Sequence, residues 1–101
     1  MSAIDDIATE RRRQQEVEGF GPDRDDGYVH HQMARAASAY AWFAGTPDDW
    51  RATYSGAPPS WPWSLEWWKP RDRRHDLVRA GALIVAEIER LDRLAAPEGR
   101  S

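Results

Sequence analysis

The sequence predicts a mostly α-helical fold: one small domain with three main helices and a connector rich in tryptophan and proline. Three stretches carry apolar residues at helical spacing, and glycine- or proline-containing breaks separate them. Four of the six tryptophans fall within residues 60–70, which also contain Pro62 and Pro70. A chain of 101 residues has room for one modest core. We therefore expect a single helical domain over residues 1–101, with 97–101 as a frayed tail.

The composition argues against several kinds of partner and site. The net charge is −3 with both signs interspersed, which argues against general nucleic-acid binding. The chain has no cysteine, so it has neither disulfides nor thiolate metal sites. It shows no signal peptide and no apolar run near the roughly 20 residues of a membrane span. We expect a soluble, cytoplasmic protein with no membrane partner.

The first helix is expected from a cap at Ser2 to about Glu18. Asp5 and Asp6 then lie in its first turn, where the helix dipole favours acids. Residues 10–16 are a charged run that indicates either a solvated face with pairs such as Arg12 to Glu16 or an anion-facing arginine. Gly19 suits the position just past the end of this helix.

The second helix is expected over residues 28–44. The acidic loop before it, residues 23–27, lacks the downstream glutamate of a calcium loop, so Asp25 or Asp26 is interpreted as a helix cap. Met33, Ala37, Tyr40 and Ala44 form a core stripe. His30 and His31, expected in the first turn, point about 100° apart and are interpreted as surface residues.

A start signal at residues 46–49 predicts a short helix around residues 50–54, with Thr46 as cap and Pro47 at the first helical position. The last helix is predicted from a cap at Asp72 to about Ala95. A continuous stripe along it is expected to face the core: Leu77, Gly81, Ile84, Ile88, Leu91 and Ala95. Gly81 inside that stripe indicates that another helix, or a ring such as Tyr40 or Trp67, packs against the backbone there.

The connector combines flat rings with positive charge. Its two prolines disfavour a helix and leave a stiff segment whose indoles can build a core or line an apolar slot. Cations follow at once, near the N-terminal end of a helix: Lys69, Arg71, Arg73 and Arg74. Rings that stack a base beside cations that hold phosphate suit a nucleotide-like small molecule. In the alternative, the rings are core and the arginines are solvated or paired with Asp76, Asp23 or Asp25.

Two catalytic patterns are present only in part. His75-Asp76 matches the centre of HD-type metal phosphohydrolases, with His30 or His31 and Asp92 as nominal partners. Glu89 and Asp92 give one half of the acidic site of MazG-type pyrophosphohydrolases, but no upstream ExxE pair exists. No nucleophile motif or phosphate loop occurs. We expect a non-catalytic protein with no metal and no cofactor.

Most of the chain resembles a family of small phage and prophage proteins. The matching segments are ERRRQ at 10–14, VEGF at 17–20, DD at 25–26, WPW at 61–63, WWKP at 67–70, DLVRAGALI at 76–84 and AEIERLDR at 86–93. The family usually has Trp at Phe20 and Arg at His75, which weakens the HD interpretation. A second, shorter segment from Arg13 to Asp26 is similar to the repeat domain of ryanodine receptors, which implies a small helical domain of a kind that can bind adenine nucleotides.

These observations and the phage resemblance lead to one expectation. The chain is expected to sequester a nucleotide-derived signalling molecule of bacterial immunity, of the cyclic nucleotide or cyclic ADP-ribose class, in the host cytoplasm as a homodimer or larger oligomer. The expected ligand-binding residues are Arg11, Asp25, Asp26, Trp61, Trp63, Trp67, Trp68, Lys69, Arg73 and Arg74. In the alternative, the same tryptophans dock on a host protein. A metal-dependent nucleotide phosphohydrolase is the third possibility.

Overall fold

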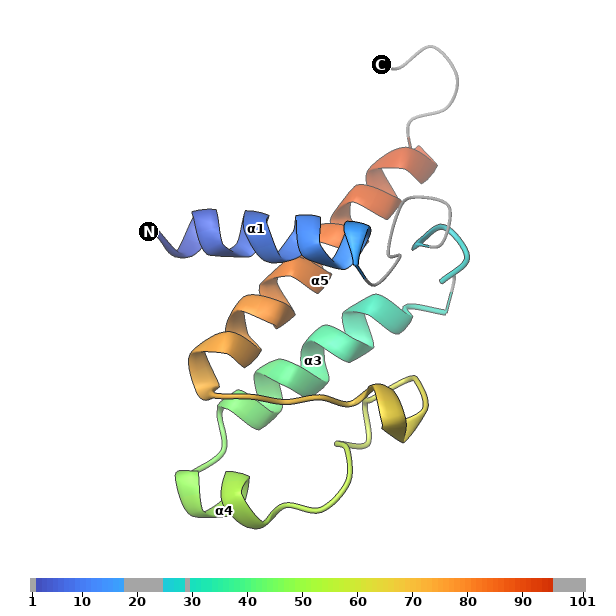
Figure 1. Cartoon of the computed structure of the whole chain (residues 1–101). Helices are drawn as coiled ribbons and strands as arrows, with labels where there is room; N and C mark the ends of the chain where they lie inside the picture. Colours follow the sequence, from blue (N-terminus) through green and yellow to red (C-terminus); the bar gives the residue numbers. More distant parts are fainter. Residues whose placement is uncertain (1, 18–24, 29, 96–101) are drawn as a thin grey trace.

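The structure is mostly α, as the sequence predicts. It is a computed structural model that describes residues 2–17, 25–28 and 30–95. Within these residues there is no strand. The elements are helix α1 (Ala3–Glu16), α3 (Gln32–Ala44), the short α4 (Asp48–Thr53), the 3₁₀ turn η1 (Leu65–Trp67) and α5 (Arg73–Ala95) (Figure 1). No helix in the described part of the chain is long and apolar enough to cross a membrane.

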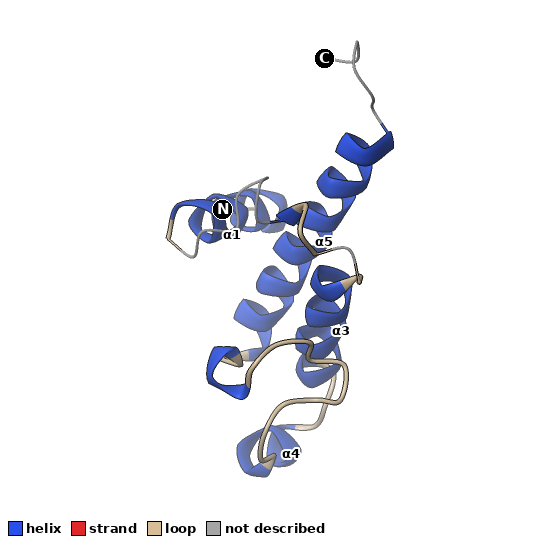
Figure 2. Cartoon of the chain, turned by 90° about the vertical axis from the view of Figure 1, so that its right-hand side faces the viewer, coloured by secondary structure: helices blue, strands red, loops and turns tan. Residues whose placement is uncertain are grey.

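Helix α5 is the central element of the fold. Helix α3 lies alongside it and α1 crosses it, whereas α4 and the connector gather near the C-terminal end of α3 (Figures 1 and 2). Small side chains at the α3–α5 contact allow a close approach of the two backbones. The buried cluster consists of Ala36, Ala37, Tyr40, Ala80 and Leu83, with Trp61, Trp63 and Trp68 packed against it.

The N-terminal boundaries agree with the expectation for α1 and differ for α3. Ser2 caps α1, since its hydroxyl accepts a hydrogen bond from the Asp5 backbone N–H at 3.1 Å. Helix α3 begins at Gln32 rather than at residue 28. His31 stops it from starting earlier, because its φ of 64° places it in the left-handed region. His30 and His31 therefore precede the helix instead of lying in its first turn.

The junction between α3 and α4 corrects the expected cap. Pro47, not Thr46, occupies the N-cap position of α4. The Thr46 hydroxyl instead donates to the Phe43 carbonyl at 2.7 Å, at the end of α3. Arg51 also donates to the Phe43 carbonyl. Arg73 donates to the carbonyls of Ala44 and Thr46. These cations satisfy the open carbonyls of α3, which is the dipole end that favours positive charge.

Helix α5 has the expected bounds but turns a different face to the core. Asp72 caps it, accepting from the His75 backbone N–H at 2.8 Å. The expectation that the apolar stripe faces the core is wrong, because its large side chains are 45–51% exposed: Leu77, Ile84, Ile88 and Leu91. The buried face carries small and charged residues instead: Asp76, Ala80, Ala82, Leu83, Ala86, Glu87 and Arg90. Charged residues reach this face because they are paired, as Arg90 is with Glu87 at 2.7 Å.

Helix α1 is held on α5 by one close contact and several ion pairs. At Gly81 an added Cβ would lie 2.9 Å from Ile7 Cδ1, so the glycine lets α1 approach the α5 backbone. The expected close approach at Gly81 is confirmed, with Ile7 in place of Tyr40 or Trp67. Arg11 bridges Glu89 of α5 and Asp25, and Asp6 pairs with Arg74.

Candidate aromatic cavity

The connector between α4 and α5 is folded by short-range hydrogen bonds. A turn is closed by Trp61 N–H donating to the Pro58 carbonyl at 2.9 Å. The 3₁₀ turn follows, with Trp67 and Trp68 donating to the carbonyls of Ser64 and Leu65. The Trp61 indole N–H also donates to the Ser64 carbonyl, at 3.1 Å. Bonds over three residues suit a segment whose prolines prevent a longer helix, so the expected non-helical or barely helical connector is confirmed.

Tyr40 of α3 anchors this connector to the core. Its hydroxyl accepts from the Lys69 backbone N–H at 3.3 Å. Its ring lies 4.6 Å from the Trp68 ring and 5.5 Å, edge to face, from the Trp61 ring. Trp61 in turn contacts Trp63 and Trp68 at 5.3 and 5.1 Å. Edge-to-face rings at these spacings contribute about 0.5–1.5 kcal/mol per pair beyond burial, so the indoles are held in fixed positions.

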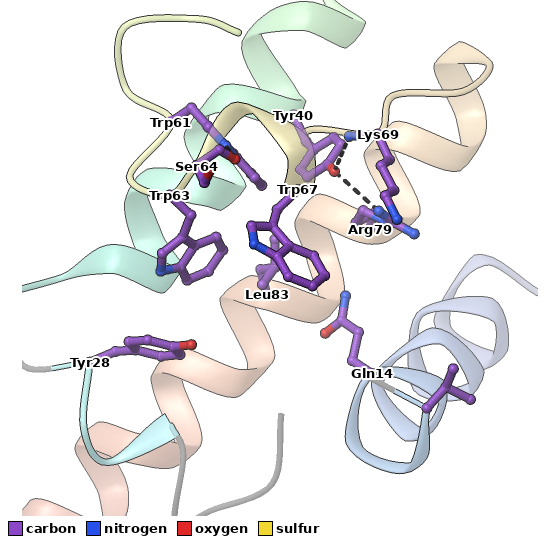
Figure 3. A pocket seen from close by; sticks show the side chains of 11 residues that line it. Gln14, Tyr28, Tyr40, Trp61, Trp63, Ser64, Trp67, Lys69, Arg79 and Leu83 are labelled. Carbon is purple, nitrogen blue, oxygen red and sulfur yellow. Dashed lines mark hydrogen bonds between the residues drawn. The ribbon is translucent and has the colours of Figure 1, made fainter. Parts of the chain in front are cut away.

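A cavity of about 480 Å³ opens beside these rings. Figure 3 shows the rings of Trp63 and Trp67 on one side of it, Tyr28 at one end and Arg79 at the other. Its size falls within the range of about 300–1,000 Å³ found for small-molecule sites. The lining residues are Gln14, Val17, Tyr28, Tyr40, Trp61, Trp63, Ser64, Trp67, Lys69, Arg79 and Leu83. They come from α1 and the residue after it, Tyr28, α3, the connector and α5, so the cavity exists only in the folded chain.

Positive charge dominates the polar lining. Lys69 Nζ lies 5.6 Å from the centroid of the Trp67 ring and forms no ion pair with the residues that the structure describes. Arg79 donates to the Tyr40 hydroxyl at 3.1 Å and lies 3.6 Å from a Glu10 carboxylate oxygen, which offsets part of its charge. Burial raises the pKa of Glu10, but Arg13 and Arg79 outweigh it and hold that pKa below its usual value. None of the lining residues that the structure describes is acidic.

Gln14 brings an amide group to the same cavity. Its side chain is 1% exposed, and Figure 3 shows the amide directed from α1 toward the cavity. The nitrogen Nε2 donates to Glu10 at 3.3 Å. The oxygen Oε1 is buried and has no hydrogen-bond partner in the described part of the chain. A buried acceptor without a partner costs about 1–3 kcal/mol, which a donor on a bound molecule can recover.

Four of the ten expected ligand-binding residues line the cavity: Trp61, Trp63, Trp67 and Lys69. Trp68 lies on the inner side of the cluster, where it contacts Tyr40 and Phe43. Arg73 is bound to the end of α3 and to Asp48. Arg74 pairs with Asp6 beside a second, more open cleft of about 470 Å³. Both arginines are thus paired with acids, although with acids other than those considered from the sequence.

The remaining three expected residues lie in ion pairs away from the cavity. Arg11 and Asp25 are both buried and meet at 2.8 Å, and Glu89 is the second partner of Arg11 at 3.1 Å. Burial raises the pKa of Asp25, while the charge of Arg11 acts in the opposite direction. Asp26 pairs with Arg93 at 2.8 Å. These contacts fasten the residues around 25–26 to α1 and α5. The expected helix cap at Asp25 or Asp26 is wrong, because α3 begins only at Gln32 and His31 occupies its N-cap position.

Sequence reasoning missed Gln14, Arg79, Tyr28 and Leu83 as cavity residues. Tyr40 was assigned to the core, and its ring is indeed buried, yet it also lines the cavity. Arg79 lies in the middle of α5 among apolar residues, which is an unusual place for a cation. That position was the one available signal, since the other residues carry no pattern that distinguishes them.

The partial catalytic patterns do not assemble into a metal site. Among the described residues, no group of three histidine, cysteine, aspartate or glutamate side chains could hold a metal ion. Asp76 is fully buried and accepts from Arg51 and from the Arg71 backbone N–H at 3.0 and 2.7 Å. Glu89 is engaged with Arg11. Asp76 and Glu89 thus have structural partners.

Comparisons with known proteins add no assignment. No family model, no curated protein and no solved structure matches the chain. The class is therefore defined by its own geometry: a small, mostly α-helical domain with an aromatic cavity whose described charged lining residues are Lys69 and Arg79.

Proposed function

We propose that this chain is a non-catalytic binding protein for a small nucleotide-derived anion. The observation that carries the proposal is the cavity itself, in which three indoles and two phenol rings stand beside Lys69 and Arg79 and none of the described lining residues is acidic. In the phage setting that the sequence resemblance implies, such binding sequesters a signalling nucleotide of bacterial immunity, of the cyclic nucleotide or cyclic ADP-ribose class.

The rings supply a stacking surface for a base. Trp67 is 58% exposed, so one of its faces is available to a ligand. Trp63, on the same side of the cavity, is half-buried and held by Trp61 and Tyr28 at 5.3 and 5.2 Å. Stacking of one base on an aromatic side chain contributes about 1–3 kcal/mol. Because the surrounding contacts fix these rings, little side-chain entropy is lost when the ligand binds.

The cations supply the complement to phosphate. The Lys69 ammonium is free of ion pairs with described residues and lies over the edge of the cavity next to Trp67. Arg79 places its guanidinium at the inner end of the cavity, where it donates to the Tyr40 hydroxyl. In this proposal Lys69 keeps the role expected of it from the sequence, and Arg79 takes the role expected of Arg11, Arg73 and Arg74.

Gln14 favours a base that carries an exocyclic amino group. Its unpartnered Oε1 is an acceptor, and an adenine or cytosine amino group is a donor of matching geometry. Uracil presents a carbonyl at the equivalent position and would leave Oε1 without a partner. We therefore expect adenine-containing ligands to bind more tightly than uracil-containing ones.

A thermal-shift and calorimetric panel of cyclic mononucleotides, cyclic dinucleotides and cyclic ADP-ribose isomers tests the proposal. At least one adenine-containing compound should stabilise the protein. Trp67→Ala should weaken that binding by about ten- to a hundred-fold, the loss of one stacking contact. Trp50→Ala is the matched control, because Trp50 is 56% exposed on α4 and does not line the cavity. Gln14→Leu should remove the preference for adenine over uracil.

Two outcomes would contradict this function. One is the absence of any stabilising compound in the panel together with no small molecule released when the pure protein is denatured. The other is equal weakening by Trp67→Ala and Trp50→Ala, which would place the ligand away from the cavity.

A protein partner is the second candidate, and the exposure of Leu65 next to Trp67 favours it. These side chains are 60% and 58% exposed, and an exposed tryptophan beside an aliphatic residue is a common anchor of protein interfaces. A stoichiometric host protein captured by the wild type and lost with both Leu65→Ala and Trp67→Ala would support this candidate. A ligand site predicts that Leu65→Ala leaves nucleotide binding unchanged.

A further inference from the structure

A buried carboxylate, that of Glu10, holds the Gln14 amide from the same helix. Gln14 lies four residues after Glu10 on α1, so the two side chains are neighbours on one face of the helix. Glu10 is 7% exposed and does not line the aromatic cavity. Its oxygen Oε2 accepts from Gln14 Nε2 at 3.3 Å. Glu10 therefore acts on the cavity only through the lining residues that it contacts.

Three donor groups converge on that single oxygen. Besides the Gln14 amide, Arg13 Nη2 lies 2.8 Å and Arg79 Nε 3.6 Å from Oε2. The other oxygen, Oε1, accepts from Arg13 Nε at 2.8 Å. Burial raises the pKa of Glu10, but Arg13 and Arg79 outweigh it and hold that pKa below its usual value. Glu10 is thus ionised at neutral pH, and an ionised carboxylate only accepts hydrogen bonds.

This acceptor decides which end of the Gln14 amide faces the cavity. The NH2 and carbonyl ends of an amide have nearly the same shape, so its partners select between the two orientations. Beside a carboxylate the NH2 end must point to Glu10. Figure 3 shows the nitrogen on the side of Arg79 and the oxygen on the side of Tyr28. The acceptor Oε1 is left for the cavity, where no described residue donates to it.

We propose that Glu10 is the positioning residue that makes the cavity select a base with an exocyclic amino group. The inference rests on the proposed function, because it concerns how that site distinguishes one class of base from another. With Oε1 of Gln14 held toward the cavity, adenine and cytosine donate their amino group to it. Hypoxanthine and uracil carry a carbonyl at the same position and place an acceptor against an acceptor.

Two cations beside Glu10 favour the opposite orientation of the amide. Arg13 and Arg79 both lie within 3.6 Å of the carboxylate oxygen to which the Gln14 nitrogen donates. A guanidinium group attracts the carbonyl end of an amide and repels its NH2 end. Without the carboxylate, the amide turns its oxygen to the arginines and its NH2 group to the cavity. The reversed amide donates to a carbonyl, so the cavity then favours hypoxanthine and uracil.

Calorimetry with two matched pairs of ligands tests the selection. Cyclic AMP is compared with cyclic IMP, and cyclic CMP with cyclic UMP; each pair exchanges an amino group for a carbonyl on the same ring system. The wild type should bind the amino member about five- to a hundred-fold more tightly, the effect of one hydrogen bond to a buried acceptor. Glu10→Met, which keeps the side-chain length, should reduce this ratio to one or reverse it.

Two control variants separate positioning from a loss of stability. Glu87 is equally buried and pairs with Arg90 three residues later, as Glu10 pairs with Arg13, but it does not line the cavity. Glu87→Met should therefore lower stability by a similar amount and leave the ratio unchanged. Glu10→Gln keeps one oxygen, which the converging donors hold at the Oε2 position, and should retain the preference. Circular dichroism confirms that each variant is folded.

A double-mutant cycle shows whether Glu10 acts through the amide. Gln14→Leu alone should bring the ratio to one. Adding Glu10→Met to Gln14→Leu should then have no further effect on the ratio, because the group that Glu10 orients is absent.

NMR of the free protein reads the orientation without a ligand. The side-chain NH2 signals of Gln14 are those that Gln14→Leu removes from the spectrum. In the wild type, nuclear Overhauser effects should connect them to the Cγ protons of Glu10. This measurement does not depend on nucleotide binding, so it decides the orientation even where the proposed function fails.

Three results would overturn the inference. The first is a folded Glu10→Met that keeps the wild-type ratio. The second is the same change of ratio in Glu10→Met and Glu87→Met. The third is the absence of a connection between the Gln14 NH2 group and Glu10 in the free protein. A wild type that shows this connection but binds no nucleotide of the wider panel contradicts the proposed function instead.

Discussion

Arg79 of α5 reaches the phenol of Tyr40 on α3 in two ways: its Nη1 lies 3.1 Å from the hydroxyl oxygen, and its guanidinium carbon lies 5.4 Å from the ring centroid. The same hydroxyl accepts from the Lys69 backbone N–H. Tyr40 is thus a core residue on its ring side and a cavity residue at its polar end. The core and the proposed ligand site therefore share this side chain, as they share Leu83.

Tyr40→Phe isolates the polar half of that arrangement. The ring stays, but Arg79 and the Lys69 N–H lose their acceptor, so we expect a loss of about 1–3 kcal/mol in the free energy of unfolding. Urea denaturation measures it. Tyr54→Phe is the matched control, because its ring packs against Trp42 and Phe43 and no described hydrogen bond depends on its hydroxyl. Equal losses in the two variants would show that the Tyr40 hydroxyl has no special role.

Arg11 should matter for stability and not for the ligand. Arg11→Ala leaves the fully buried Asp25 without its partner and should lower the free energy of unfolding by about 3–5 kcal/mol. The double variant Arg11→Met, Asp25→Leu should recover most of this loss, because no unpaired charge remains. Arg12→Ala, an exposed neighbour, should change stability by less than about 0.5 kcal/mol. If the folded double variant Arg11→Met, Asp25→Leu bound the nucleotide with a different affinity from the wild type, Arg11 would contribute to the ligand site.

Gly81→Ala and Ile7→Ala should be coupled. Alanine in a helix interior is about 1 kcal/mol more favourable than glycine, but its Cβ at Gly81 would meet Ile7 Cδ1 at 2.9 Å. We expect Gly81→Ala alone to change the free energy of unfolding little, and to stabilise by about 1 kcal/mol once Ile7→Ala has opened the space. Urea denaturation of the wild type, the two single variants and the double variant measures the coupling. The same gain with and without Ile7 would mean that α1 does not press on Gly81.

His75 should make stability depend on pH. Burial, together with the charges of Arg79 and Arg71, holds its pKa below the ordinary value of 6.5, and Glu10 and Asp76 only partly oppose this. The unfolded chain therefore takes up a proton first as the pH falls. The contribution is fully present above about pH 7 and is lost as the pH falls through 6.5 toward the folded-state pKa.

Titration of His75 by NMR measures the folded-state pKa directly. We expect a midpoint below 6.5, and a shallower fall in the free energy of unfolding between pH 7 and 5 for His75→Gln than for the wild type. A midpoint above the ordinary value, or identical pH dependence in the two proteins, would contradict the burial of the ring.

The sequence predicted the helices better than it predicted their faces. The apolar repeat from Leu77 to Leu91 located α5 correctly, but the same repeat serves equally for packing within a chain and between chains. The true buried face includes Asp76, Glu87 and Arg90, and no hydrophobic pattern marks it. Such residues are buried only because a partner meets them, and for Asp76 the main partner, Arg51, lies on another helix.

The residues of the candidate site were likewise predicted only in part. Trp61, Trp63, Trp67 and Lys69 are close in the sequence, so local composition was sufficient to bring them together. Arg11 and Asp25 were also selected for charge, and the structure uses them to bind each other. Gln14 and Arg79 enter the cavity from separate helices, which only the three-dimensional arrangement reveals.

The contacts of α1 with α5 join residues that are far apart in the sequence. Asp6 and Arg74 are 68 positions apart, and Arg11 and Glu89 are 78 positions apart. During synthesis the first helix therefore leaves the ribosome long before its binding surface exists. At about 5–20 residues per second it waits several seconds for the last segment to emerge. The nascent protein spends that interval with its N-terminal segment undocked. Translation that stops before α5 yields a product in which neither α1 nor α3 has the surface of α5 to pack against.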